Sequence, residues 1–141
     1  MRVSALLLLL VAAASSSAKD EPTSVAALEA NGVKPVTQER LVELIVGNTL
    51  LHRNLRSVND LDILYRADGI RVYWSGGPGI GRRFEGWYKI RDGKRCELSV
   101  SRGEVCFTLY PARSDDYFVC DAAGMCDWIV AIEKGNPLRI D

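Results

Sequence analysis

The stretch LDILYRADGIRVYW, residues 61–74, decides the fold class. Apolar residues occupy alternate positions before its turn (61, 63 and 65) and after it (70, 72 and 74). A period of two is typical of a β-strand with one buried face, and Asp68-Gly69 is a preferred hairpin turn. The sequence therefore predicts an antiparallel β-hairpin here.

The same pattern continues on both sides of this hairpin. Short runs of β-branched and aromatic residues are separated by turn signals such as Asp92-Gly93 and Arg102-Gly103. The predicted strands cover residues 49–55, 61–65, 70–74, 84–90, 96–100, 105–110, 117–120 and 125–132. This succession predicts a mainly β fold, an antiparallel meander of about eight strands that forms a small up-and-down barrel or a strongly curved sheet.

One short N-terminal helix is expected before the strands. Thr37 is a good N-cap, apolar residues recur at helical spacing (41, 44 and 45), and Gly47 stands where a C′ glycine belongs. These signals predict a helix over residues 38–46. Residues 19–36 show no sustained periodicity and are predicted to be a flexible leader. A single β domain is expected over residues 37–138.

Residues 1–18 have the pattern of a secretory signal peptide. Arg2 supplies the positive charge, residues 5–14 are apolar, and Ser16 with Ala18 satisfies the small-x-small cleavage rule. A membrane-spanning helix needs about 20 apolar residues, which is more than this run contains. The sequence therefore predicts cleavage after Ala18, a periplasmic or secreted location, and no membrane span.

The charge balance excludes a general attraction to polyanions. The chain has 18 Lys plus Arg and 18 Asp plus Glu. Since Arg2 belongs to the predicted signal peptide, the mature chain has a net charge near −1. Nucleic acid is not an expected partner of such a protein.

The cysteines predict two disulfides, because thiols of an exported chain meet an oxidising environment. Three pairings are possible. We predict Cys96 with Cys106 and Cys120 with Cys126, since each pair flanks a tight turn and would connect the two strands of a hairpin. The spacings differ from those of zinc knuckles, so no metal site is predicted.

Several short motifs give the chain a resemblance to small exported proteobacterial proteins grouped as a domain of unknown function. The motifs are Gly47-Asn48-Thr49-Leu50 after the helix, Gly86-Trp87 in a strand, the cysteines of the following hairpin, and Gly135-Asn136-Pro137 at the end. The resemblance covers residues 37–138. It implies export and a compact domain, and it carries over no activity or catalytic residue. Many such proteins have one cysteine pair, so the Cys120 to Cys126 bridge departs from the pattern.

Residues 82–95 form the strongest local charge asymmetry. They contain six basic residues with Trp87 and Tyr88 among them, opposed only by Glu85 and Asp92. Alternation places Trp87 on an outer, charged strand face. This stripe is interpreted either as a binding surface or as the solvated face of two strands. The candidate surface-binding residues are Arg82, Arg83, Trp87, Lys89, Arg91 and Arg95.

No motif predicts catalysis or a cofactor. His52 is the only histidine, and no serine occupies a G-x-S-x-G setting. The aspartates around Asp60 lack the EF-hand register, and the glycine-rich loop over residues 76–81 precedes a strand, not a helix. We therefore predict no catalytic residue, no cofactor and no metal.

The sequence predicts an exported, non-enzymatic binding domain. One possible ligand is a small apolar molecule inside a barrel. The interior would then be lined by Trp74, Tyr88, Leu98 and Trp128. The other possible partner is an envelope or protein surface that binds the basic stripe. The alternative function is a periplasmic enzyme whose site is assembled only in three dimensions, with His52, Asp62 or Tyr110 as conceivable members.

Overall fold

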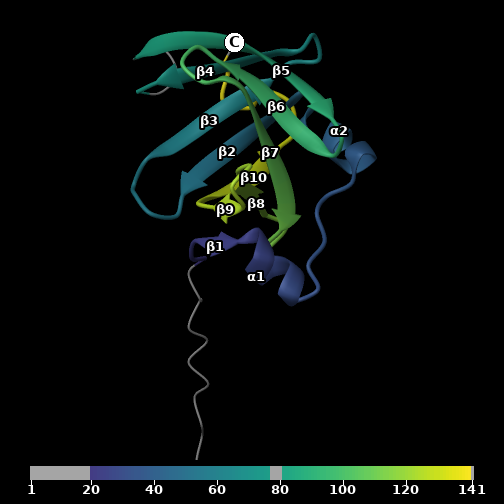
Figure 1. The fold of residues 1–141 in the computed structure, drawn as a ribbon. Helices are drawn as coiled ribbons and strands as arrows, with labels where there is room; N and C mark the ends of the chain where they lie inside the picture. The colour runs from purple at the N-terminus through teal and green to yellow at the C-terminus, as the bar shows by residue number, and fades with distance from the viewer. Residues whose placement is uncertain (1–19, 77–80, 141) are drawn as a thin grey trace, which may run out of the picture.

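A computed structural model describes residues 20–76 and 81–140 (Figure 1). The predicted signal peptide over residues 1–18 lies outside the described residues, as do residues 77–80 of the glycine-rich loop. No helix in the described ranges is long and apolar enough to cross a bilayer.

Eight antiparallel strands form a closed barrel, so the first of the two predicted architectures is confirmed. The strands follow the chain as a meander, and pairing of β10 with β2 closes the circle. Their bounds are β2 (Asn48–Asn54), β3 (Asp60–Tyr65), β4 (Ile70–Ser75), β5 (Arg82–Arg91), β6 (Lys94–Ser99), β7 (Gly103–Pro111), β8 (Tyr117–Cys120) and β10 (Trp128–Glu133). A closed barrel leaves none of these eight strands with a free edge.

Helix α2 (Gln38–Ile45) covers one end of the barrel, close to the predicted bounds. The Thr37 side chain caps it by accepting from the Arg40 backbone NH at 3.3 Å. Leu41, Leu44 and Ile45 are buried and pack on interior side chains of the barrel. The chain leaves the helix through Gly47, whose φ of +78° favours glycine.

The two Gly-Asn motifs meet at the closing pair of strands and form a clasp of Asn48, Thr49 and Gly135. The Asn48 amide nitrogen donates to the carbonyls of Glu43 and Leu44, both at 3.1 Å, at the end of α2. Its oxygen accepts from the Gly135 NH at 3.0 Å, and the Thr49 hydroxyl donates to the Gly135 carbonyl at 2.7 Å. These motifs therefore hold the helix, the first barrel strand and the chain after the last one together.

Residues 20–36 differ from the flexible leader that we expected. They contain β1 (Thr23–Ser24) and α1 (Val25–Ala30), and β1 pairs with β9 (Met125–Cys126). Leu28 of α1 is buried against Tyr110 and the second disulfide. The predicted strand over residues 125–132 is accordingly two strands. Its first two residues pair with β1, and the remainder, after Asp127, is β10 of the barrel.

Both predicted disulfides are present. Cys96–Cys106 joins directly opposed residues of β6 and β7, and Cys120–Cys126 joins barrel strand β8 to β9 of the small sheet. Two disulfides are consistent with an oxidising location outside the cytoplasm.

The interior lining was predicted correctly for two residues of four. Tyr88 and Trp128 belong to the interior cluster. Trp74 lies on the outer face of β4, where it packs near Ile140 and its indole NH donates to the Ile140 carbonyl at 3.0 Å. Leu98 also faces outward and is 57% exposed. The prediction for Trp74 and Leu98 is wrong because hydrophobicity alone does not say which face of a strand lines a barrel.

Candidate functional site

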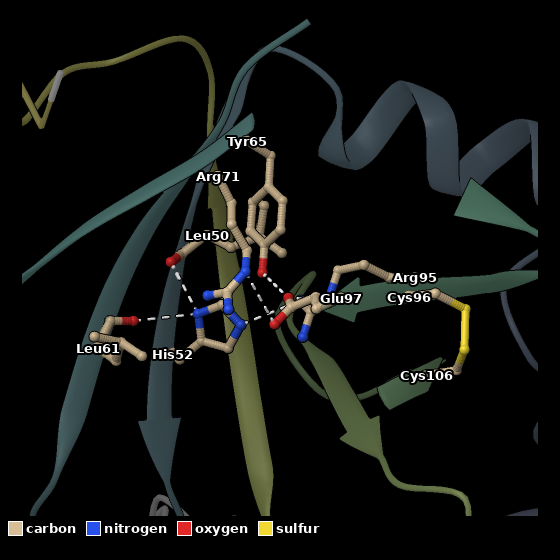
Figure 2. Close-up of polar contacts among 9 residues, drawn as sticks. All are labelled: Leu50, His52, Leu61, Tyr65, Arg71, Arg95, Cys96, Glu97 and Cys106. Carbon is tan, nitrogen blue, oxygen red and sulfur yellow. Dashed lines mark hydrogen bonds and ion pairs between the residues drawn. A yellow bond between two sulfur atoms is a disulfide. The ribbon is translucent and has the colours of Figure 1, made fainter. Parts of the chain in front are cut away.

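The centre of the barrel holds five polar side chains, which we call the charged cluster. Its members are His52 of β2, Tyr65 of β3, Arg71 of β4, and Arg95 and Glu97 of β6 (Figure 2). They come from four strands and converge because each occupies an inward position of its strand. Polar groups buried together in this way need partners, and their contacts are specific.

Glu97 is the hub of the charged cluster. Its carboxylate accepts from the Tyr65 hydroxyl at 2.6 Å and forms ion pairs with Arg95 Nε at 3.1 Å and Arg71 Nε at 3.4 Å. Burial alone would raise the pKa of Glu97, but the attraction of the two guanidinium groups outweighs it and lowers the pKa. Burial raises the pKa of Tyr65 well above its usual value. Glu97 is therefore ionised and Tyr65 is a neutral donor.

His52 is a neutral member of the charged cluster. Its Nδ1 lies 3.1 Å from the carbonyl oxygens of Leu50 and of Leu61, which can only accept, so the proton resides on Nδ1. Nε2 then accepts from Arg95 Nη1 at 3.2 Å. Burial, followed by the charge of Arg95, lowers the pKa of His52 to about 3. Both ring nitrogens are thus engaged with protein groups.

The charged cluster carries a net charge of +1, since two guanidinium groups face one carboxylate. Arg95, which is 3% exposed, lies between the rings of Tyr65 and Phe107, with its Cζ 5.2 Å and 5.1 Å from the two ring centres. Arg71 lies 5.4 Å from the ring centre of Tyr73. The Nε of each arginine is buried without an aligned hydrogen-bond acceptor. Aromatic faces therefore stabilise part of the positive charge.

Gly86 provides space for the charged cluster. It is the cross-strand partner of Arg71, and a Cβ at this position would lie 3.3 Å from Arg71 Nε. That distance is shorter than ordinary van der Waals contact, so any larger residue would displace the guanidinium group. The glycine of the Gly86-Trp87 motif thus positions Arg71 beside Glu97.

Above the charged cluster, the end of the barrel away from α2 is lined by apolar side chains. We call it the open end, because its inward-facing side chains keep partial exposure: Leu61, Tyr73, Phe84, Val105 and Trp128. Tyr73 and Phe84 stack at a centroid distance of 5.1 Å, and Arg82 lies 5.3 Å from the Phe84 ring centre. Trp128 meets His52 edge-on at 6.3 Å. An apolar rim therefore stands over a positively charged floor.

The basic stripe predicted over residues 82–95 is divided by strand alternation. Arg83, Trp87, Lys89 and Arg91 share the outer face of β5, and Trp87 is 61% exposed. Arg83 pairs with Glu85 at 2.5 Å, Lys89 pairs with Glu104 at 2.7 Å, and Arg91 also contacts Glu104. Arg82 contacts Phe84 at the open end.

Arg95 is not a surface residue, so the prediction that it binds a surface partner is wrong. It lies inside the barrel because Cys96, its neighbour, bonds Cys106 on the outer face of β6 and β7. Successive residues of a strand alternate between faces, so Arg95 and Glu97 must both face inward. The cysteine pairing was thus the signal in the sequence that could have located two of the five members of the charged cluster.

The three residues considered for an enzyme site, His52, Asp62 and Tyr110, do not lie together. His52 lies in the interior, whereas Asp62 lies on the outer face of β3, beside Leu51 and Ala131. Tyr110 packs beneath α1 and donates to Glu29 at 2.9 Å. The structure therefore places these three side chains in three different environments.

Comparisons with known proteins add no assignment. No protein-family model, curated protein or solved structure matches the chain. The resemblance to exported proteobacterial proteins therefore stays a prediction, and function is inferred from the geometry of the barrel.

Proposed function

We propose that this protein is an exported binding domain that holds a small amphipathic anion at the open end of its barrel. The observation that supports it is the net positive charge of the charged cluster directly beneath partly exposed aromatic side chains. Binding sites for small molecules typically combine an apolar lining with a few convergent polar groups. A ligand with an apolar body and a carboxylate head has the chemistry that matches this arrangement.

Arg71 is the residue that best suits the anionic head. Its side chain is 14% exposed, compared with 3% for Arg95, so it is the more accessible guanidinium group. A charge-assisted bond from Arg71 to the anionic head would neutralise the excess positive charge of the charged cluster. A neutral apolar ligand would instead desolvate that charge without compensation. We therefore replace the small apolar ligand predicted from the sequence with one that has an apolar body and an anionic head.

The ligand body is confined to the open end. On the α2 side the interior is occupied by the protein's own buried side chains, among them Leu50, Ile63, Leu109 and Val130. Tyr73, Phe84 and Trp128 are the aromatic groups available to contact the ligand. The proposal therefore concerns a medium-chain or single-ring molecule, because no long tail can enter the filled half.

Decanoate, with decanol as its neutral counterpart, tests the proposal by isothermal titration calorimetry. We expect decanoate to bind at least tenfold more tightly than decanol. Arg71→Gln should weaken decanoate binding by about 10- to 100-fold, since a hydrogen bond to a charged group contributes about 1.5–3 kcal/mol. Arg66→Gln is the matched control, because Arg66 is exposed and pairs with Asp68.

Two results would contradict the proposal. One is equal affinity for decanoate and decanol, which would mean that charge plays no part. The other is the absence of decanoate binding up to about 1 mM, a concentration that corresponds to only about 4 kcal/mol of binding free energy. If Arg71→Gln fails to fold, Tyr73→Ala tests the same site without touching the ion pairs.

Export is part of the proposal, and it is supported by the pattern of residues 1–18 and by the two disulfides. Expression of the whole chain in a bacterium should give an extracytoplasmic species that begins at Lys19 and has no free thiol. Intact-mass measurement before and after alkylation checks both features. A cytoplasmic species that retains residues 1–18 and four thiols would contradict export.

A further inference from the structure

The outer face of β5, β6 and β7 carries a second, independent inference. We propose that it is a docking surface for an anionic lipid bilayer. Trp87 and Leu98 would enter the headgroup region, and the surrounding Lys and Arg side chains would contact lipid phosphates. We call this surface the lipid face, and its residues are Arg83, Trp87, Lys89, Arg91, Lys94, Leu98, Val100 and Arg102.

The apolar centre of the lipid face consists of Trp87 and Leu98 on neighbouring strands. They line a hollow of about 190 Å³ together with Cys96 and Glu104, and they are 61% and 57% exposed. Val100, in the turn between β6 and β7, is fully exposed. Large apolar side chains grouped on a surface mark an interaction site more often than isolated ones do. Trp in particular suits a bilayer interface, because its ring is apolar and its NH is polar.

Cations surround this apolar centre. The five basic residues of the lipid face are opposed by three carboxylates, those of Glu85, Asp92 and Glu104. Glu85 is already paired with Arg83, and Glu104 is shared by Lys89 and Arg91. The face therefore has a local net charge of +2 on a chain whose formal net charge is zero. Each basic residue near an anionic lipid surface strengthens binding.

The opposite side of the barrel has the reverse charge. In the closed strand order β2 lies four strands from β6, and among the described residues its outer surface has three carboxylates, those of Asp60, Asp62 and Asp116, around the single cation Arg53. A molecule with cations on one side and carboxylates on the other is oriented by an anionic surface. The lipid face would approach such a surface first.

The lipid face is rigid and has no free strand edge. The Cys96–Cys106 disulfide lies on it and joins β6 to β7, so little conformational entropy is lost on binding. Strands β5, β6 and β7 are paired on both sides, and therefore no peptide can add to them as an extra strand. A rigid surface with an apolar centre and a cationic rim matches a bilayer better than a peptide ligand.

Vesicle binding by the disulfide-bonded protein tests the inference. We expect at least tenfold stronger partitioning to phosphatidylcholine vesicles with about 30% phosphatidylglycerol than to phosphatidylcholine alone. Raising the salt to about 0.5 M should weaken it by at least tenfold. Trp87 emission should shift to shorter wavelength on binding, and Trp87→Phe should remove most of that shift.

Variants of the lipid face separate specific docking from general charge. Lys94→Glu with Arg102→Glu should lower partitioning at least tenfold, and Trp87→Ala should lower it at least fivefold. Lys34→Glu with Lys134→Glu is the matched control, because it changes the net charge equally at exposed positions elsewhere. Equal losses in the two double variants would overturn the inference. Equal binding to both vesicle types would also overturn it. A third contrary result is a protein that binds no vesicles but binds a soluble polyanion such as heparin, with an affinity that Trp87→Ala leaves unchanged.

Discussion

The charged cluster and the lipid face share strand β6 and have opposite relations to solvent. On β6, Arg95 and Glu97 lie inside the barrel, whereas Leu98 is exposed. On β5, Tyr88 is buried and Trp87, its neighbour, is exposed. The usual distribution, with apolar residues inside and charged residues outside, is therefore inverted on β6. Strand alternation, and not the polarity of single residues, decides where each side chain lies.

The inversion is tolerable because the charged cluster is internally paired. Burying ions is costly unless opposite charges and hydrogen bonds compensate, and here Glu97 contacts both arginines and Tyr65. The lipid face needs no such compensation, because water solvates its cations. Loss of a carboxylate should therefore lower the free energy of unfolding strongly inside the barrel and only slightly on its outer face.

Removal of a carboxylate should produce the largest difference in stability between the two regions. Glu97→Ala leaves two buried guanidinium groups without a carboxylate, and we expect it to lower the free energy of unfolding by about 3–5 kcal/mol. Glu104→Ala removes an exposed ion-pairing carboxylate on the lipid face and should cost less than about 1 kcal/mol. Urea unfolding of both variants measures the contrast. Similar losses of unfolding free energy in the two variants would show that the stability of the charged cluster does not depend on Glu97.

Acidification should have the next largest effect, through His52. Its pKa is lowered to about 3 in the folded protein, so between pH 6.5 and 4.5 the unfolded chain binds a proton and the folded protein does not. Stability therefore falls as the pH drops, by about 1.4 kcal/mol per unit, or about 2–3 kcal/mol over this window.

His52→Gln isolates this dependence on pH. The variant should lose most of the slope between pH 6.5 and 4.5 in urea unfolding. Glu97 contributes at lower pH, because its lowered pKa gives stability that is present above the unfolded value and lost as the pH falls through the folded value. An unchanged slope in His52→Gln would mean that His52 becomes charged in the folded barrel.

Truncation of Trp87 should have the smallest effect on stability. Trp87→Ala removes a mostly exposed side chain, and we expect a change within about 0.5 kcal/mol. Trp128→Ala removes an indole from the interior cluster and should cost about 3 kcal/mol. Thermal unfolding of the two variants compares them directly. A large loss for Trp87→Ala would indicate a structural role and weaken its assignment to lipid docking.

Local patterns were sufficient to predict most of the fold. The hairpin over residues 61–74, helix α2 with its Thr37 cap, both disulfides and the number of barrel strands followed from alternation and turn chemistry. The segment before α2 was missed because its strand has two residues and its helix has six, lengths at which periodicity gives no signal. The division of the predicted strand over residues 125–132 into β9 and β10 was missed, because it depends on the pairing of β9 with β1, which is distant in sequence.

The candidate sites were less predictable than the fold. The exposure of Trp87 followed from alternation on β5, but the burial of Arg95 required the inward face of β6 to be known. Tyr65, Arg71 and Glu97 come from three strands, and their convergence depends on closure of the barrel. Convergence of this kind has no local sequence pattern. The role of Gly86 also has no local pattern, because the glycine is needed only to leave space for the Arg71 guanidinium group on the neighbouring strand.

The closing pair of strands has a consequence for aggregation. Every other pairing in the barrel joins strands that are neighbours in the meander, whereas β2 and β10 come from its two ends. If this pair alone separates, β2 and β10 become free edges at which further chains can add. The clasp of Asn48, Thr49 and Gly135 bonds β2 to the residues that follow β10, at the end nearest α2. Loss of these hydrogen bonds would therefore favour separation of β2 from β10 and, with it, self-association.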